Sequence, residues 1–396
     1  MKVLCIFGTR PEAIKMAPVL HHLRQYPGTI SAKACVTGQH RQMLDQVLQV
    51  FDIQPDYDLS IMTEDQTLAT LTARALTALD PVIAQERPDW ILVQGDTTTA
   101  MVGALAAFYH RLQVGHVEAG LRTWNKYHPY PEEINRRIVD CIADLHFAPT
   151  QWAADNLLRE GVPESGVLVS GNTVVDALIS VTEKPLSEQT ERILRELGVS
   201  PERGHSDPTS GLSLAARGHG PPLLLVTAHR RENFGGPLEN ICDALGEIAR
   251  RRSDVRIVFL VHLNPNVQKV VRSRLGEAKN ISLIPPVDYQ TMAHLMKHSY
   301  LILTDSGGLQ EEAPTFHVPV LVMRETTERP EALEAGTARL VGTQAEDIVD
   351  HVSRLLDRSD EYRAMSGAPN PFGDGHAAPR IVKALMERSS RLAYRG

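Results

Sequence analysis

The sequence has few cysteines, no long apolar run and no metal-binding histidine spacing, and each absence excludes a class of protein. The four cysteines, Cys5, Cys35, Cys141 and Cys242, lack the close pairs of a zinc site or a redox motif, so we expect reduced thiols. No apolar stretch approaches the roughly 20 residues that a membrane-spanning helix needs. The sixteen histidines include no His-Glu-x-x-His or similar spacing. We therefore expect no metal, no cofactor and no membrane segment.

The formal net charge of -7 also lacks the positive excess that attracts nucleic acid nonspecifically. Any anionic ligand must then be held by local groups. The apolar residues 1–7 run straight into Gly8-Thr9-Arg10-Pro11, without the longer apolar core and the cleavage site of a secretory signal. We interpret this segment as a first strand and expect a cytoplasmic protein.

Short apolar runs alternate with longer amphipathic segments in both halves of the 396-residue chain. The expected strands are residues 3–7, 32–36, 90–93 and 114–117 in the first half, and 223–227, 256–261, 281–284, 300–304 and 320–323 in the second. Strands that alternate with helices predict parallel sheets covered on both faces. The pattern therefore indicates two doubly wound α/β domains, each with its ligand site at the carboxyl ends of the strands.

We expect an N-terminal domain over residues 1–172, a C-terminal domain over residues 173–375 and a terminal helix over residues 376–396. Residues 204–222 are rich in Gly, Ser and Pro and lack periodicity. This composition predicts a mobile surface loop without chemistry. If the carboxyl edges of the two sheets face each other across a cleft, the substrate is expected between them.

A strand, a glycine turn and a helix start are predicted near residue 300, where an apolar run stops at Asp305-Ser306-Gly307-Gly308. Adjacent glycines let the backbone approach a ligand, and the amides at a helix start attract an anion such as a phosphate. Glu312 falls about one turn into this helix, where it could meet a sugar diol. A Ser-Gly-Gly turn also ends strands where the chain simply bends, so other segments must support the interpretation.

Charged residues follow the predicted strands of the first half. Arg10 and Lys15 place two cations near a helix start, where acids are ordinarily preferred, which favours a phosphate-binding role. Lys15 is equally compatible with a solvated helix position. Asp96 and Glu118 each follow a strand. Asp96 could instead cap the next helix, and Glu118 could pair with Arg122.

Further charged segments lie in a predicted helix and after two later strands. Glu132 and Arg136 are four residues apart in a helical segment, where a solvated salt bridge is the default expectation. Residues 229–231 place one imidazole and two guanidinium groups at a strand end, and three donors in a row suit a diphosphate. The charged loop 324–331 is as typical of a salt-bridged surface turn as of a binding loop.

Together these motifs closely resemble the non-hydrolysing UDP-N-acetylglucosamine 2-epimerases. The matching segments, in order and nearly end to end, are residues 8–12, 94–98, 115–122, 130–133, 171–173, 227–233, 305–312 and 324–330. The resemblance implies a glycosyltransferase-B-like architecture, with two Rossmann-like domains facing a cleft and a terminal helix that returns to the first domain. It also implies a homodimer.

The resemblance further implies the reversible interconversion of UDP-N-acetylglucosamine and UDP-N-acetylmannosamine. Because the C2 proton is not acidic, the family expels UDP from C1 while the C2 proton is removed, and UDP then re-adds to a bound glycal. Carboxylates must move protons and stabilise oxocarbenium-like charge, and Asp96, Glu118 and Glu132 are the candidates. Which of them is acid and which is base stays open.

The resemblance makes His229 a further catalytic residue and assigns the remaining site residues to substrate binding. The expected set is Ser306, Gly307 and Gly308 at the phosphates, Glu312 on the ribose, His229 and Arg329 nearby, Arg10, Lys15 and His229 for the departing diphosphate, and Arg136 as an orienter of Glu132.

Some members of the family bind UDP-N-acetylglucosamine at a second, regulatory pocket. Residues that match those used there are Gln39, Gln42, Glu132, Arg230 and His262, whereas Asp65 stands where those relatives carry an arginine. Two alternative activities share the same fold. One is a glycosyltransferase that passes the sugar to an acceptor, and the other is a 2-epimerase of a more decorated UDP-sugar. A nucleotide-sugar-binding protein without catalytic activity is disfavoured, because it would not need the carboxylates of Asp96, Glu118 and Glu132.

Overall fold

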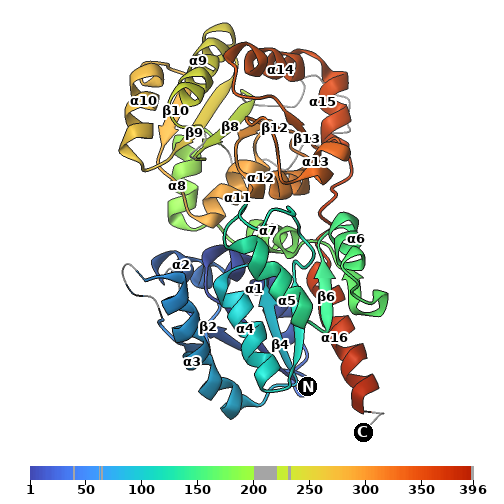
Figure 1. Ribbon diagram of the computed structural model, residues 1–396. Helices are drawn as coiled ribbons and strands as arrows, with labels where there is room; N and C mark the ends of the chain where they lie inside the picture. The colour runs from blue at the N-terminus through green and yellow to red at the C-terminus, as the bar shows by residue number, and fades with distance from the viewer. Residues whose placement is uncertain (39–40, 62, 64–65, 200–220, 231–232, 394–396) are drawn as a thin grey trace. The chain divides into compact units, whose positions relative to one another are not determined.

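The computed structural model describes residues 1–38, 41–61, 63, 66–199, 221–230 and 233–393 (Figure 1). The chain divides into two compact units. Unit 1 comprises Met1–Val181 and Phe372–Gly396, and unit 2 comprises Thr182–Pro371. Of the predicted mobile loop, residues 204–220 lie outside the described residues.

Unit 1 is built on a seven-stranded parallel sheet with the strand order β3-β2-β1-β4-β5-β6-β7. Its strands are β1 (Lys2–Phe7), β2 (Ser31–Val36), β3 (Tyr57–Asp58), β4 (Trp90–Gln94), β5 (Gln113–Val117), β6 (Leu145–Ala148) and β7 (Val167–Val169). The chain order reverses between β1 and β4. Such a reversal opens a crevice at the carboxyl ends of the strands, where doubly wound proteins bind their ligands.

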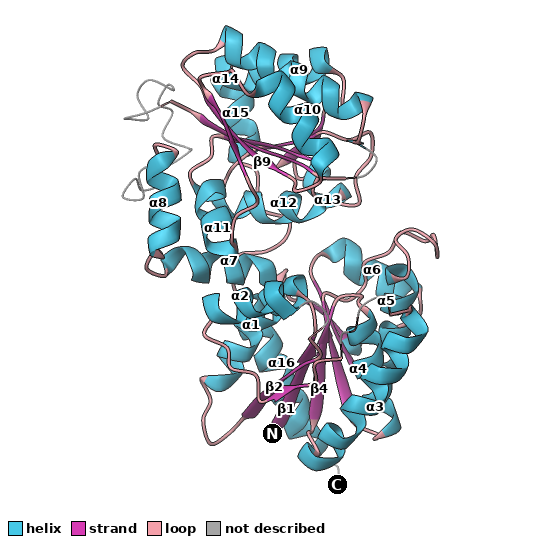
Figure 2. Ribbon diagram, turned by 90° about the vertical axis from the view of Figure 1, so that its left-hand side faces the viewer, coloured by secondary structure: helices cyan, strands magenta, loops and turns pink. Residues whose placement is uncertain are grey.

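Helices cover both faces of this sheet (Figure 2). They are α1 (Arg10–Arg24), α2 (Arg41–Val50), α3 (Leu68–Glu86), α4 (Thr98–Tyr109), α5 (Glu132–Ile142), α6 (Gln151–Arg159), α7 (Thr173–Glu183) and α16 (Ala377–Ala393), with a 3-10 turn at Glu164–Gly166. Apolar residues of β1, β4 and β5 form one core with α3, α4 and α5. This core fixes where the ends of those three strands lie.

The terminal helix α16 packs against α1 in unit 1. Asp176 of α7 accepts hydrogen bonds from the amides of Ala377 and Ala378 at 3.2 and 2.9 Å. A carboxylate at this position satisfies amides that the first helical turn leaves unpaired. Further along α16, the Ser389 hydroxyl accepts a hydrogen bond from the Trp90 indole at 2.8 Å.

Unit 2 is built on a six-stranded parallel sheet with the order β10-β9-β8-β11-β12-β13. Its strands are β8 (Leu223–Ala228), β9 (Arg256–Val261), β10 (Ile281–Ile284), β11 (Leu301–Thr304), β12 (Val320–Val322) and β13 (Ala338–Leu340). The order reverses between β8 and β11, so this sheet has its own switch point.

The helices of unit 2 include a tightly packed pair, α9 and α14, on one face of the sheet. The set is α8 (Glu188–Glu196), α9 (Gly236–Arg251), α10 (Pro265–Leu275), α11 (Tyr289–Lys297), α12 (Gly307–Glu312), a 3-10 turn (Ala313–Phe316), α13 (Pro330–Glu334), α14 (Ala345–Asp357) and α15 (Ser359–Ser366). None of the described helices is both long enough and apolar enough to cross a bilayer.

The predicted fold class of two Rossmann-like α/β domains with parallel sheets is confirmed. The strands expected from apolar runs all form, with ends within about one residue of the expectation. Four strands were not predicted, namely β3, β6, β7 and β13, and each spans only two to four residues. Runs this short show too little alternation to be distinguished from loops.

Candidate active site

The turn after β4 presents Asp96 and is held by α5. Gly95 has φ +68°, in the left-handed region that glycine adopts readily. The Arg136 guanidinium forms an ion pair with the Asp96 carboxylate, and the Asn135 amide donates to the Asp96 carbonyl at 2.9 Å. Thr97 caps α4 through its hydroxyl, which accepts a backbone hydrogen bond at 3.0 Å. The alternative that Asp96 caps this helix is therefore wrong.

Glu118 follows β5 in a strained backbone conformation with φ +67°. Its Oε2 lies 2.5 Å from Lys15 Nζ and accepts a hydrogen bond from Gln94 Nε2 at 2.5 Å. Non-glycine residues in this region concentrate at functional sites, where the surrounding structure holds them. Lys15 is thus an ion-pair partner rather than a solvated helix residue. The alternative pairing of Glu118 with Arg122 does not form, because Arg122 bonds other acids.

Glu132 is the first residue of α5, and its Oε2 is buried without a hydrogen-bond partner in the described part of the chain. The expected salt bridge between Glu132 and Arg136 does not form. Arg136 instead lies 3.4 Å from Glu133, which also accepts from the amides of Thr123 and Trp124 at 3.1 Å. The prediction that Arg136 orients Glu132 is therefore wrong. A buried, unpartnered carboxylate oxygen is costly, which is typical of a position that receives a ligand.

Glu12, in the third position of α1, was not predicted as a site residue. It is buried, and it accepts hydrogen bonds from the amides of Gly8 and Thr9 at 3.1 and 2.7 Å and from the Thr97 hydroxyl at 2.7 Å. Burial raises its pKa to about 7, although these hydrogen bonds oppose the shift. Glu12 therefore joins the turn after β1 to the turn after β4. The Thr-x-x-Glu spacing of a capping box was the available signal.

Arg10 begins α1 beside this turn and is partly exposed. It has no hydrogen bond or ion pair with the described residues. A guanidinium placed at a helix start without an anionic partner is available to an anionic ligand.

Asp305, directly after β11, organises the corresponding edge of unit 2. Its Oδ2 accepts hydrogen bonds from the amides of His229 and Arg230, both at 2.8 Å, and from the Asn233 side chain at 3.0 Å. Its Oδ1 lies 3.0 Å from His229 Nδ1. Burial opposes the shift, but His229 holds the pKa of Asp305 below its ordinary value. Asp305 therefore fixes the imidazole of His229, whose side chain is 43% exposed.

Two guanidinium groups lie beside the glycine turn that follows Asp305. A Cβ on Gly307 would lie 3.7 Å from Arg230 Nη2 and 3.9 Å from Arg329 Cζ. Arg329 forms an ion pair with the buried Glu311, and Arg230 Nη2 lies 3.6 Å from Glu328. Guanidinium groups suit phosphate oxygens because their donors form a rigid fork. The turn thus combines close backbone access with local positive charge.

The other residues expected to bind substrate in unit 2 also belong to this turn and its helix. Ser306 occupies the N-cap position of α12, Gly308 is exposed on its first turn, and Glu312 is its last residue. Glu312 is partly buried.

The residues expected in a regulatory pocket are described only in part. Arg230 follows β8, and His262 follows the neighbouring β9, where it is exposed and accepts from an amide at 3.2 Å. Gln39 and Asp65 lie outside the described residues, as does the side chain of Gln42 in α2.

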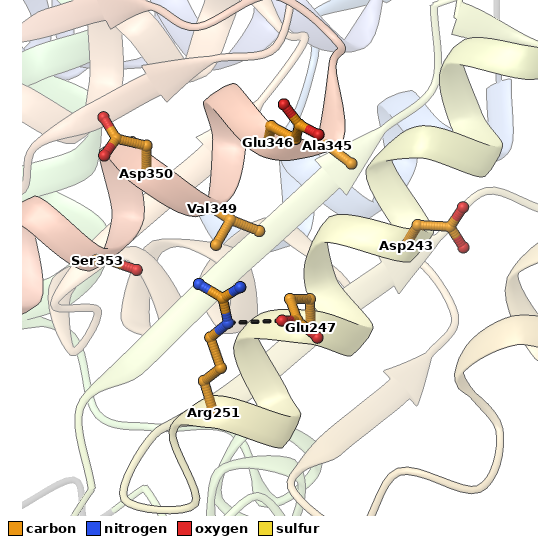
Figure 3. Close-up of a pocket in the computed structure, with 8 residues that line it drawn as sticks. All are labelled: Asp243, Glu247, Arg251, Ala345, Glu346, Val349, Asp350 and Ser353. Carbon is orange, nitrogen blue, oxygen red and sulfur yellow. Dashed lines mark hydrogen bonds and ion pairs between the residues drawn. The ribbon is translucent and has the colours of Figure 1, made fainter.

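A separate hollow of about 500 Å³ lies between α9 and α14 in unit 2 (Figure 3). Its lining comprises Asp243, Glu247, Arg251, Ala345, Glu346, Val349, Asp350 and Ser353. Arg251 is paired with Glu247 at 2.6 Å, so carboxylates dominate the lining and oppose a diphosphate. The hollow contains none of the candidate residues. Within the described residues, no three His, Cys, Asp or Glu side chains gather in a way that could hold a metal ion.

Comparisons with known proteins match nearly the whole chain to one family. The family described as UDP-N-acetylglucosamine 2-epimerase matches residues 22–386. The UDP-N-acetylglucosamine 2-epimerase of Escherichia coli K12 is 52% identical over 385 residues, which cover 97% of this chain and 98% of that protein.

Two solved structures show the same likeness. The putative UDP-N-acetylglucosamine 2-epimerase of Listeria monocytogenes superposes with a TM-score of 0.88 at 45% identity, over 98% of this chain and 97% of that chain. The enzyme of Neisseria meningitidis, bound to UDP-GlcNAc, gives a TM-score of 0.82 at 44% identity, over 98% and 100%. With acids at the strand ends of unit 1 and cations at those of unit 2, this chain belongs to the UDP-N-acetylglucosamine 2-epimerase family.

Proposed function

We propose that this protein interconverts UDP-N-acetylglucosamine and UDP-N-acetylmannosamine by inverting C2 of the sugar. Membership of the epimerase family along nearly the whole chain supports the activity. A relative from Neisseria meningitidis bound to UDP-GlcNAc supports the substrate. The observation that supports the mechanism is the placement of Asp96 and Glu118 directly after the neighbouring strands β4 and β5, with Glu132 at the start of α5.

The cation-rich turn of unit 2 binds the uridine diphosphate in this proposal. The backbone at Gly307 admits phosphate oxygens, with Arg230 and Arg329 beside it. His229 is oriented by Asp305 and presents its exposed edge to the diphosphate. When the bond from C1 to the diphosphate oxygen breaks, its electron pair leaves with UDP, and nearby cations stabilise that charge.

The acids of unit 1 act on the sugar in this proposal. As UDP leaves C1, a carboxylate accepts the C2 proton and a C1–C2 double bond forms, giving the glycal. Return of a proton to the opposite face of C2, with attack of UDP on C1, completes the inversion. Glu132 has an open buried oxygen for such a transfer, whereas Asp96 and Glu118 are each held by a cation. Lys15 and Arg10 add positive charge at the same sheet edge.

Incubation with UDP-N-acetylglucosamine in deuterated water, without an added cofactor or acceptor, tests the activity. We expect both epimers to form and to carry deuterium at C2, because the proton removed exchanges before it returns. Free sugar with UDP would indicate hydrolysis instead. An unchanged substrate would reject the proposed reaction, and activity that appears only with an acceptor would indicate a glycosyltransferase.

A homodimer is also proposed, and the surface of unit 1 supports it. Four large apolar side chains are exposed on helices α4 and α5, which pack against each other. These are Phe108, Tyr109, Ile134 and Ile138, exposed by 61%, 62%, 38% and 36%. Apolar residues on neighbouring helices are typical of a surface that a second copy of the chain covers.

Regulation by UDP-N-acetylglucosamine at a second pocket is a further proposal, which Arg230 and His262 support because they follow neighbouring strands. If this pocket operates, turnover of UDP-N-acetylmannosamine alone starts with a lag that traces of UDP-N-acetylglucosamine abolish. Linear initial rates, unchanged by such traces, would reject it.

A further inference from the structure

A buried ionic network connects the elements that carry the three candidate acids, although it contains none of them. Its centre is His116 of β5, which is fully buried. Nδ1 of His116 lies 2.5 Å from Asp140 Oδ1, and Nε2 lies 2.7 Å from the carbonyl oxygen of Gly95. Because both ring nitrogens face acceptors, both must donate, which is the form of an imidazolium.

Asp140, on α5, joins this imidazole to the turn after β5. Its Oδ2 accepts from the Arg122 guanidinium at 2.7 Å and from the amide of Gly120 at 3.3 Å. Burial by itself raises the pKa of Asp140, but His116 and Arg122 together lower it to about 2. The network therefore holds a carboxylate between two cations inside the unit.

The two backbone contacts of His116 and Asp140 lie close in sequence to candidate acids. Gly95, the acceptor of His116, directly precedes Asp96. Gly120, the donor to Asp140, lies two residues after Glu118. The same helix α5 that carries Asp140 begins at Glu132.

Such a network is a poor way to stabilise a fold. Desolvating several charges offsets most of their attraction, so apolar residues of similar volume often give equal or greater stability. Ionic groups fix directions and distances more closely than apolar contacts, because each hydrogen bond has a preferred geometry. The position of this network therefore suits alignment of the acids better than stabilisation.

We propose that His116 and Asp140 are positioning residues that set the relative placement of Asp96, Glu118 and Glu132. The inference rests on the proposed function, because it gives the three acids a shared substrate. Neither residue needs to touch that substrate. Both act by fixing the positions of the turns after β4 and β5 relative to the start of α5.

The test compares His116→Gln and Asp140→Asn with the unmodified protein. A displacement of about 1 Å reduces rates by roughly 100-fold, so we expect kcat to fall by about 10- to 100-fold in both variants. The KM for the UDP-sugar and the Kd for UDP should stay within about 3-fold, because the turn proposed to bind the diphosphate, with Arg230 and Arg329, lies in unit 2. With substrate deuterated at C2, the isotope effect on kcat should rise, because proton transfer becomes rate-limiting.

Glu160→Gln is the matched control. Glu160 accepts from Arg122 at 2.6 Å and lies 3.4 Å from Arg137, but among the described residues it bonds neither Gly95 nor Gly120, the two backbone contacts of the network. This variant removes charge from the same network, so we expect a lower Tm with kcat within about 2-fold of the unmodified protein. UDP binding measures the folded fraction of every variant and corrects kcat for it. An equal loss of kcat in Glu160→Gln, or a loss confined to KM, would overturn the positioning role.

The outcomes also separate this inference from the proposed function. If the unmodified protein does not epimerise UDP-N-acetylglucosamine, the proposed function fails, and the positioning role fails with it. If the unmodified protein is active and Asp96→Asn is inactive, but His116→Gln and Asp140→Asn keep full kcat, the positioning role alone is overturned.

Discussion

Glu12 makes the stability of unit 1 depend on pH. Its pKa rises from 4.5 to about 7 on burial, so the folded state binds a proton more tightly than the unfolded state. The protonated Glu12 therefore contributes fully to the free energy of unfolding below about pH 4.5. This contribution is lost as the pH rises through about 7, which lowers the free energy of unfolding by roughly 3 kcal/mol in all.

Urea unfolding followed by tryptophan fluorescence measures this effect, because Trp90, Trp124 and Trp152 all belong to unit 1. Glu12→Gln keeps the shape but cannot ionise, so its unfolding free energy should exceed that of the unmodified protein increasingly between about pH 5 and about pH 8. A difference between the two proteins that does not change with pH would contradict the assignment.

Asp96 offers the most direct single-residue test of the proposed chemistry. Asp96→Asn preserves the size of the side chain but removes the negative charge that faces Arg136. Loss of a proton-transferring or charge-stabilising carboxylate costs about 100- to 10,000-fold in kcat. UDP binding, followed by calorimetry, should persist because the turn proposed to bind the diphosphate belongs to unit 2. Turnover at the unmodified rate would reject the role of Asp96.

At the scale of elements, Asp305 joins the ends of β8 and β11. Asp305→Asn keeps one oxygen for the amides of His229 and Arg230 and the side chain of Asn233, which all bond Oδ2, but it removes the negative charge and replaces the Oδ1 beside His229 with an amide nitrogen that cannot accept. Hydrogen bonds to a charged group contribute about 1.5–3 kcal/mol, more than those to a neutral one, so the amide holds these donors less strongly. We expect weaker UDP binding, by roughly 10-fold, together with lower stability of unit 2.

Asp254→Asn is a control for this prediction. Asp254 is also a carboxylate of unit 2, but it bonds Arg252 on the surface. Its removal should leave UDP affinity unchanged, since exposed ion pairs contribute little. Equal UDP affinity in Asp305→Asn and in the unmodified protein would contradict the view that Asp305 shapes the phosphate turn.

The sequence alone predicts strands and helices better than it predicts which side chains pair with each other. Apolar runs before Asp96, Glu118 and Asp305 identify the strand ends, because chain order and parallel pairing bring such ends to one edge. The predicted partner of Arg136 is wrong. Its spacing of four residues along the helix favours Glu132, whereas in the structure Arg136 pairs with Asp96. The rotation of α5 against the turn after β4 determines this choice, and it depends on packing that no local spacing encodes.

The buried network illustrates the same limit. His116 lies within an apolar strand and Asp140 within a helix, 24 residues apart, and no motif links them. Their contact follows from the crossover that carries α5 back over the sheet. Glu12 is the opposite case, because its capping-box spacing was readable in the sequence.

At the scale of the whole molecule, the exposed apolar residues of α4 and α5 predict self-association. Ile138→Asp places a charge within the proposed contact, where burial would desolvate it, so we expect the dimer to dissociate. Leu263→Asp is the control, because Leu263 is 63% exposed and belongs to unit 2. Sedimentation velocity should show a monomer for Ile138→Asp and a dimer for Leu263→Asp. A monomeric unmodified protein, or an Ile138→Asp variant that stays dimeric, would place the interface elsewhere or remove it.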